Sequence, residues 1–173
     1  MTSGVPESAL TFAEIETAAE TFARENLFSP QQNDIRDLVS NLGGQLDLAQ
    51  SPDSMAQDGG SMYASRTGQF TIHLSPFTGV LRDNFTIAHE LGHRELHVAE
   101  YFRQNPDQDT VRVNRFGNDK PELQANRFAA ALLMPAEAFS FIGEHTGWNV
   151  PALSVHFSVS QPAAQYRADF LRR

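Results

Sequence analysis

The stretch FTIAHELGH, residues Phe85–His93, decides the fold of this chain. It places His89 and His93 four positions apart, with Glu90 directly after the first histidine. Residues four apart on a helix lie one above the other, so two imidazoles can converge on one metal ion. Glu90 projects from the next position round the helix, where a carboxylate can take a proton from water held at the metal.

A simpler interpretation of the same residues is an ordinary helix whose His and Glu side chains face solvent. The neighbouring residues argue against it, because Ile87, Ala88 and Leu91 are apolar and polar groups buried beside them need partners. We therefore expect a metal site on a helix that runs from about Asp83 or Asn84 to Tyr101.

A catalytic zinc site usually has three protein ligands and one open position. The residue six positions after His93 is Ala99, which excludes a third histidine at that spacing. Glu122, 122 − 93 = 29 residues after His93, is the best remaining candidate, and an acid at a helix N-terminus is its alternative interpretation. Asn126 lies one turn beyond Glu122 and could fix the tautomer of a ligand imidazole.

Composition restricts the chemistry. The chain has 173 residues, 13 Lys and Arg against 21 Asp and Glu, a net charge of −8 and no cysteine. These counts exclude disulfides, a thiolate metal site and a cysteine nucleophile, and they argue against non-specific coating of nucleic acid. The chain also lacks a membrane-length apolar run and the features of a signal peptide, so we expect a cytoplasmic protein.

The hydrophobic periodicity and turn residues predict an α+β fold with a small antiparallel or mixed sheet. Helices are expected at about 12–26, 33–42, 83–101, 121–134, from 135, 151–157 and 160–172, and strands at 45–50, 62–65 and 69–75. Residues 51–61 and 105–119 are expected to be irregular. We expect one domain, 1–173, with the N-terminal helices, sheet and catalytic core in 1–134 and a helical part in 135–173.

Two segments together carry a family resemblance. FTIAHELGH, followed by ELQANRFAAALLMP at residues 122–135, resembles the ImmA/IrrE family of bacterial metallo-endopeptidases over most of the chain. The resemblance implies a zincin-like, gluzincin-type site in which His89, His93 and Glu122 bind Zn²⁺, with Mn²⁺ as the alternative in the cell. It implies that Glu90 is the general base.

The resemblance also implies where a substrate would lie. The strand that ends at residue 75 would follow the cleft, so a substrate could add to it as a further strand. The residues expected to pair with the substrate are Phe70, Thr71, Ile72, His73 and Leu74. His73 alternates away from the apolar positions, so its side chain is expected to face solvent.

Several other polar residues are candidates for supporting roles. Tyr63, Arg82 and Tyr101 could each stabilise the oxyanion of a tetrahedral intermediate. His97 lies eight positions after His89 and rotates off the ligand face of a regular helix, so we expect it beside the site rather than on the metal. His145 and His156 are expected to be surface residues.

The C-terminal segment 153–164 resembles a helix-turn-helix, with the turn at Val159 and Ser160 and with Ser160 as the N-cap. DNA contact is one interpretation. We favour a helical pair packed on the core, because residues 160–164 contain no Lys or Arg. Arg167, Arg172 and Arg173 could still form a small basic end.

The function expected from the resemblance is cleavage of a helix-turn-helix repressor encoded nearby, which would switch on a stress, phage-defence or mobile-element response. Activation of the protein by DNA is a weaker expectation from the same resemblance. The first alternative is an anti-repressor that binds its partner without cutting it and uses the metal structurally. The second alternative is a DNA-binding regulator.

Overall fold

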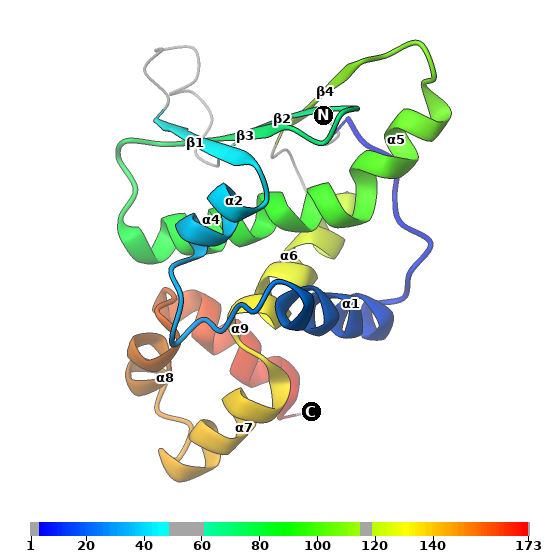
Figure 1. The fold of residues 1–173 in the computed structure, drawn as a ribbon. Helices are drawn as coiled ribbons and strands as arrows, with labels where there is room; N and C mark the ends of the chain where they lie inside the picture. The colour runs from blue at the N-terminus through cyan, green and yellow to red at the C-terminus, as the bar shows by residue number, and fades with distance from the viewer. Residues whose placement is uncertain (1–3, 49–60, 115–118, 173) are drawn as a thin grey trace.

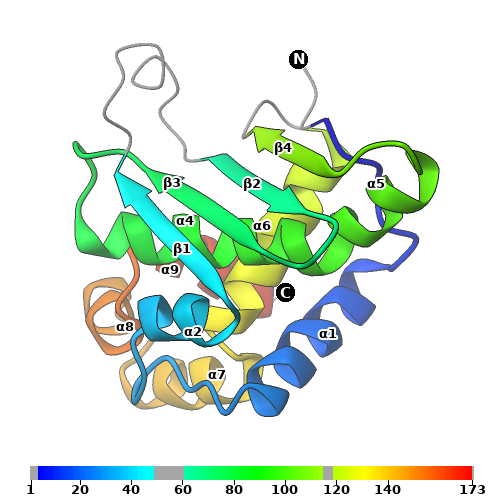
Figure 2. The ribbon, with the colours of Figure 1, turned by 45° about the horizontal axis from the view of Figure 1, so that its top comes forward.

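The computed structural model describes residues 4–48, 61–114 and 119–172. A four-stranded sheet lies over helix α4, helix α6 crosses α4 on the side away from the sheet, and α1 and the C-terminal helices lie beyond (Figures 1 and 2). The predicted α+β class is therefore confirmed. The elements are α1 Phe12–Glu25, α2 Ile35–Asn41, β1 Gly44–Leu48, β2 Ser61–Ser65, β3 Phe70–Leu74, α4 Val80–His93, a π-helical turn Arg94–Val98, α5 Ala99–Gln104, β4 Thr110–Asn114, α6 Lys120–Leu133, α7 Ala136–His145, α8 Val150–Phe157 and α9 Gln161–Leu171.

The sheet has the strand order β1-β3-β2-β4, in which β1 and β3 are parallel and the other pairs are antiparallel. Ile72 of β3, Met62 of β2 and Val113 of β4 are register partners across the sheet, and all three are fully buried. The period-two alternation predicted for β3 is thus correct. Pairing of a substrate with Phe70–Leu74 is wrong, however, because β1 and β2 already occupy both edges of this strand.

Strand β4 is an element that the sequence did not predict, since 105–119 was expected to be irregular. Val111 and Val113 are buried against the core and alternate with the exposed Arg112, which is the pattern of a half-buried strand. Two valines in a polar segment are not enough, by themselves, to predict a strand. Pairing along β2 supplies the backbone hydrogen bonds that stabilise it.

Helix α1 begins as predicted, with a capping box between Thr11 and Glu14. Helix α4 begins at Val80, three or four residues earlier than predicted. Its N-cap is Gly79. Asn84 lies within the helix, and its side chain accepts from Arg36 Nη1 at 2.9 Å and donates to the Ser158 carbonyl at 3.1 Å.

The close approach of α4 and α6 depends on Gly92. A Cβ at this position would lie 3.1 Å from both the Ala125 carbonyl oxygen and Phe128 Cβ. The missing side chain therefore lets the two backbones pack closely. This packing brings the ligand candidates of α4 opposite Glu122 of α6.

The C-terminal helices agree with the prediction at one residue and differ from it at another. Ser160 caps α9 as predicted, and its side chain accepts from Ala163 N. Arg167, in contrast, is not part of a basic end, because it is fully buried and forms ion pairs with Glu16 of α1. No helix in the described ranges is long and apolar enough to cross a membrane.

Candidate metal centre

Two helices bring three potential ligands together. His89 and His93 of α4 have their Nε2 atoms 3.1 Å apart. Glu122 of α6 approaches both, with Oε1 3.0 Å from His93 Nε2 and Oε2 3.3 Å from His89 Nε2. All three residues are buried, and one ligand atom from each lies within 4.8 Å of the others.

Local capping positions the carboxylate of Glu122. Asp119 is the N-cap of α6 and accepts a hydrogen bond from the Glu122 backbone N–H at 3.2 Å. Glu122 therefore occupies the first turn of α6, and its side chain points toward His89 and His93. The two interpretations of Glu122, an acid favoured at a helix N-terminus and a ligand candidate, describe the same arrangement.

The protonation states suit metal ligands. Burial lowers the pKa of His93 to about 4, so its imidazole is neutral at neutral pH. Burial alone would raise the pKa of Glu122, but the contacts of its carboxylate with His89 and His93 lower it to about 2. Metal ligands must be neutral imidazoles and ionised carboxylates, and the pKa values of His93 and Glu122 favour these forms.

The orientation of His89 gives a further reason for a cation. His89 Nδ1 lies 2.9 Å from Asn126 Oδ1, and donation to that oxygen leaves Nε2 with a lone pair. The lone pair faces the ionised carboxylate of Glu122, and two acceptors so close together repel unless a cation or a proton lies between them. The donor set, two imidazole nitrogens and a carboxylate, fits a divalent metal.

Glu90 is 1% exposed and directly follows His89 on α4. The general-base role expected for Glu90 stays a prediction. Its neighbours along the helix, Ala88 and Leu91, are fully buried.

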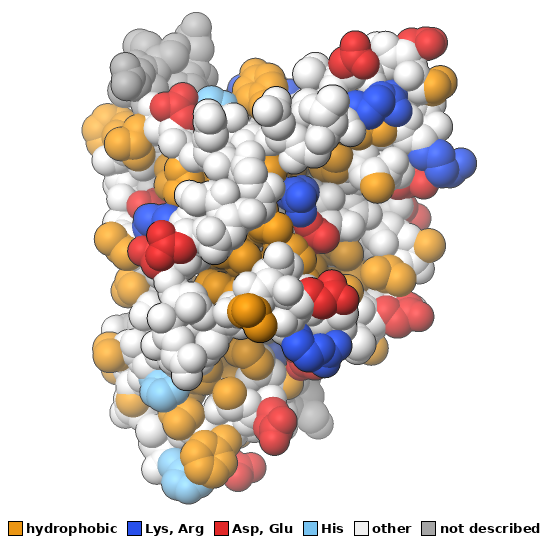
Figure 3. All heavy atoms as spheres, viewed as in Figure 1, with side chains coloured by type: hydrophobic (Ala, Val, Ile, Leu, Met, Phe, Trp, Pro, Cys, Tyr) orange, Lys and Arg blue, Asp and Glu red, His pale blue; other side chains and the backbone are white. Residues whose placement is uncertain are grey.

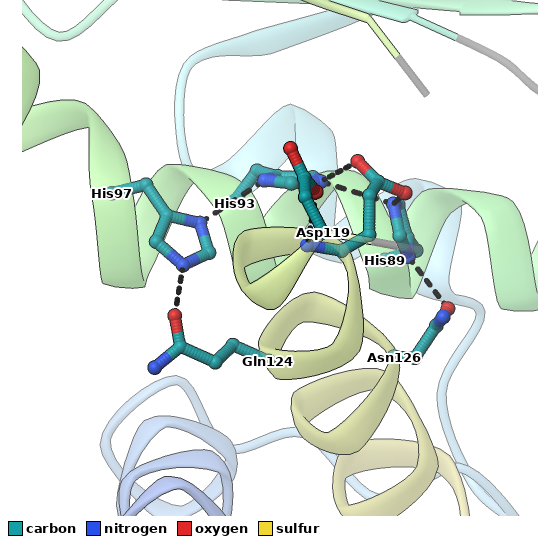
Figure 4. Close-up of polar contacts among 7 residues, drawn as sticks. His89, His93, His97, Asp119, Gln124 and Asn126 are labelled. Carbon is teal, nitrogen blue, oxygen red and sulfur yellow. Dashed lines mark hydrogen bonds and ion pairs between the residues drawn. The ribbon is translucent and has the colours of Figure 1, made fainter. Parts of the chain in front are cut away.

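His97 lies beside the triad, as expected. Its Nδ1 is 3.0 Å from His93 Nδ1, on the opposite side of that ring from the metal-facing atom (Figure 4). His97 lies four positions after His93, so the two imidazoles meet one turn apart, here across the π-helical turn over Arg94–Val98.

The oxyanion candidates lie in different places. Tyr63 alternates with the buried Met62 and Ala64 of β2, so it lies on the outer face of the sheet, against His73. The His73 side chain is 26% exposed there and lies 3.5 Å from Asp47. Tyr101 packs on Phe102 of α5.

Arg82 lines a groove that the sequence did not indicate. The groove lies between α1, α4, α6 and α9 and has a volume of about 730 Å³. Asn126, the hydrogen-bond partner of His89, also lines it. Most of the other lining side chains are apolar, among them Phe12, Phe85, Leu123 and Tyr166.

One buried polar residue near the site was not predicted from the sequence. Gln124 is buried on α6, and its Oε1 lies 3.1 Å from His97 Nε2. The available signal was a glutamine two residues after Glu122 on a helix that is otherwise rich in alanine and leucine.

Comparison with known proteins identifies the family. A peptidase-family model described as the IrrE N-terminal-like domain matches residues 49–169, which include the whole triad. The chain belongs to the IrrE N-terminal-like family. A search of curated proteins found no match. The family and the donor set together make this a metallopeptidase-like chain with a site for a divalent metal.

A solved structure supports the fold of this IrrE N-terminal-like chain. It is titled Mycobacterium tuberculosis transcriptional regulator, and it matches with a TM-score of 0.61 at 16% sequence identity. The match covers 90% of this chain and 46% of that protein, so the chain spans about half its length. At this identity the likeness concerns the fold alone.

Proposed function

We propose that this protein is a metal-dependent endopeptidase. The convergence of His89, His93 and Glu122 within one buried cluster, with Glu90 next to the first ligand, is the observation that carries the proposal. The Nε2 atoms of both histidines and the Glu122 carboxylate would hold the ion, for which we propose Zn²⁺ or Mn²⁺. When bound, the ion supplies Lewis acidity toward water and toward a carbonyl oxygen.

Glu90 is proposed as the general base. Its carboxylate accepts a proton from the attacking water and then delivers that proton to the leaving amine. Burial among the apolar residues of α4 keeps bulk water from competing for this proton. The groove beside Asn126 supports a polypeptide substrate, because its apolar lining can bind the side chains of an extended or helical segment.

The proposed substrate is a helix-turn-helix transcriptional repressor. Membership of a peptidase family and a structural neighbour titled as a transcriptional regulator are consistent with this substrate. DNA binding by the chain itself has less support. Arg167 of α9 is buried, and acidic and basic side chains are intermixed on the face seen in Figure 3.

The test is Glu90→Gln, with Glu137→Gln on the exposed side of α7 as the matched control. Purified protein loaded with Zn²⁺ or Mn²⁺ is incubated with the proposed helix-turn-helix repressor substrate, and products are identified by mass spectrometry. Loss of a general base should reduce cleavage by roughly 10²–10⁴-fold while metal binding is retained. The control should cleave like the unsubstituted protein.

Two outcomes would contradict the proposal. Cleavage by Glu90→Gln at the unsubstituted rate would exclude Glu90 as the base. Full relief of repression by Glu90→Gln in cells would instead indicate an anti-repressor that acts by binding alone.

A further inference from the structure

We propose that Gln124, anchored by the backbone of residues 8–10, sets the tautomers of His97 and His93 so that His93 presents a lone pair to the metal. Gln124 and His97 would be positioning residues that act through His93. The inference rests on the metal site of the proposed function, and it assigns a role to the N-terminal segment that precedes α1.

The contacts form an unbroken chain. Ser8 N–H donates to Gln124 Oε1 at 3.0 Å, and Gln124 Oε1 lies 3.1 Å from His97 Nε2. His97 Nδ1 then lies 3.0 Å from His93 Nδ1 (Figure 4). His93, His97 and Gln124 are all buried, so bulk water does not substitute for any member of this chain.

The direction of these hydrogen bonds is fixed where Gln124 meets the backbone of residues 8–10. A backbone N–H can only donate, so the atom of Gln124 that faces Ser8 N must be the amide oxygen. The Gln124 amide nitrogen agrees, because it donates to the Ser8 carbonyl at 2.8 Å and to the Leu10 carbonyl at 3.4 Å. A flipped amide would place donor against donor and acceptor against acceptor.

The remaining assignments follow from this orientation. Because Gln124 Oε1 is an acceptor, His97 Nε2 must carry the proton, and the Nδ1 of a neutral His97 is an acceptor. That Nδ1 faces His93 Nδ1, which must therefore donate. His93 Nε2 is left with its lone pair, directed at His89 and Glu122. A ligand histidine whose other nitrogen donates to a fixed acceptor is the arrangement that orients metal sites.

The first test reads the tautomers directly. Nitrogen-15 chemical shifts of the imidazoles, measured by NMR in the metal-free full chain, should show His93 protonated at Nδ1 and His97 protonated at Nε2. Either histidine in the opposite tautomer overturns the proposal. This readout needs no bound metal and no substrate.

The second test measures Zn²⁺ affinity by competition with a chromogenic chelator. His97→Leu removes the acceptor for His93 and should weaken binding by about 10–100-fold, the usual effect of losing such a partner. His97→Asn places a carbonyl oxygen near the former Nδ1 and should restore most of that affinity. Gln124→Met should weaken binding in the same direction, whereas Gln165→Met, exposed on α9, should not.

A purely structural role predicts a different pattern. In that case the two apolar variants would lower the unfolding temperature of the metal-free protein but leave the Zn²⁺ affinity of the folded protein unchanged, and the proposal would be refuted. Failure of the unsubstituted protein to bind Zn²⁺ or Mn²⁺ would instead refute the metal site of the proposed function. The measured tautomers of His93 and His97 would still decide whether Gln124 sets them as proposed.

Discussion

Replacement of Glu16 by alanine should leave the buried guanidinium of Arg167 without its carboxylate partner. Arg167 is fully buried and donates to both oxygens of Glu16, from Nη1 at 2.6 Å and from Nη2 at 3.1 Å. Arg127 of α6 lies 3.2 Å from the same carboxylate. One acidic side chain of α1 therefore pairs with cations from α6 and α9.

The expected cost follows from the burial of this pair. Removal of one partner of a buried ion pair costs about 3–5 kcal/mol, because the other charge stays desolvated. The Glu16 side chain is 16% exposed, and Arg167 Nε still donates to the Met134 carbonyl at 2.9 Å. We therefore expect the lower end, a loss of about 3 kcal/mol in the free energy of unfolding.

Thermal unfolding of the metal-free protein measures this loss. For a chain of this size, 3 kcal/mol corresponds to a fall of about 6–12 °C in the unfolding temperature. Glu20→Ala, exposed one turn later on α1, is the matched control and should change stability by less than about 0.5 kcal/mol. The reasoning is refuted if Glu16→Ala unfolds at the same temperature as this control.

Two further predictions concern the site. Gly92→Val should force α4 and α6 apart, lower stability by about 1–3 kcal/mol and weaken Zn²⁺ binding. The control Gly79→Ala has open space around its Cβ position and should have none of these effects. Equal Zn²⁺ affinities of the two variants would contradict this prediction. Burial lowers the pKa of His93 and of His97 from the ordinary 6.5 to about 4. The unfolded chain therefore binds protons that the folded chain does not, and urea midpoints of the metal-free protein should fall as the pH decreases from about 6.5 to about 4. Midpoints that stay constant across this range would exclude neutral buried histidines.

Local patterns in the sequence predicted several features of this structure. The i, i+4 spacing of His89 and His93 places two imidazoles on one face of any helix, and caps such as Thr11 and Ser160 fix where helices begin. Glu122 was the best remaining third-ligand candidate from its position after His93, and the family motif then implied it as a ligand, but nothing local brings residue 122 to residue 93. The proximity of His89, His93 and Glu122 and the helix starts agree with the structure, because each prediction rests on contacts within one or two turns of the chain or on a motif carried by neighbouring residues.

Tertiary packing decided the rest. Strand β4 exists because β2 lies beside it, and β3 is closed to a substrate because β1 pairs with its other edge. The sequence suggested a surface arginine at position 167, but the approach of α1 buried it against Glu16. A residue's own sequence neighbourhood sets its helical face, whereas its burial and partners depend on which distant segments pack against it.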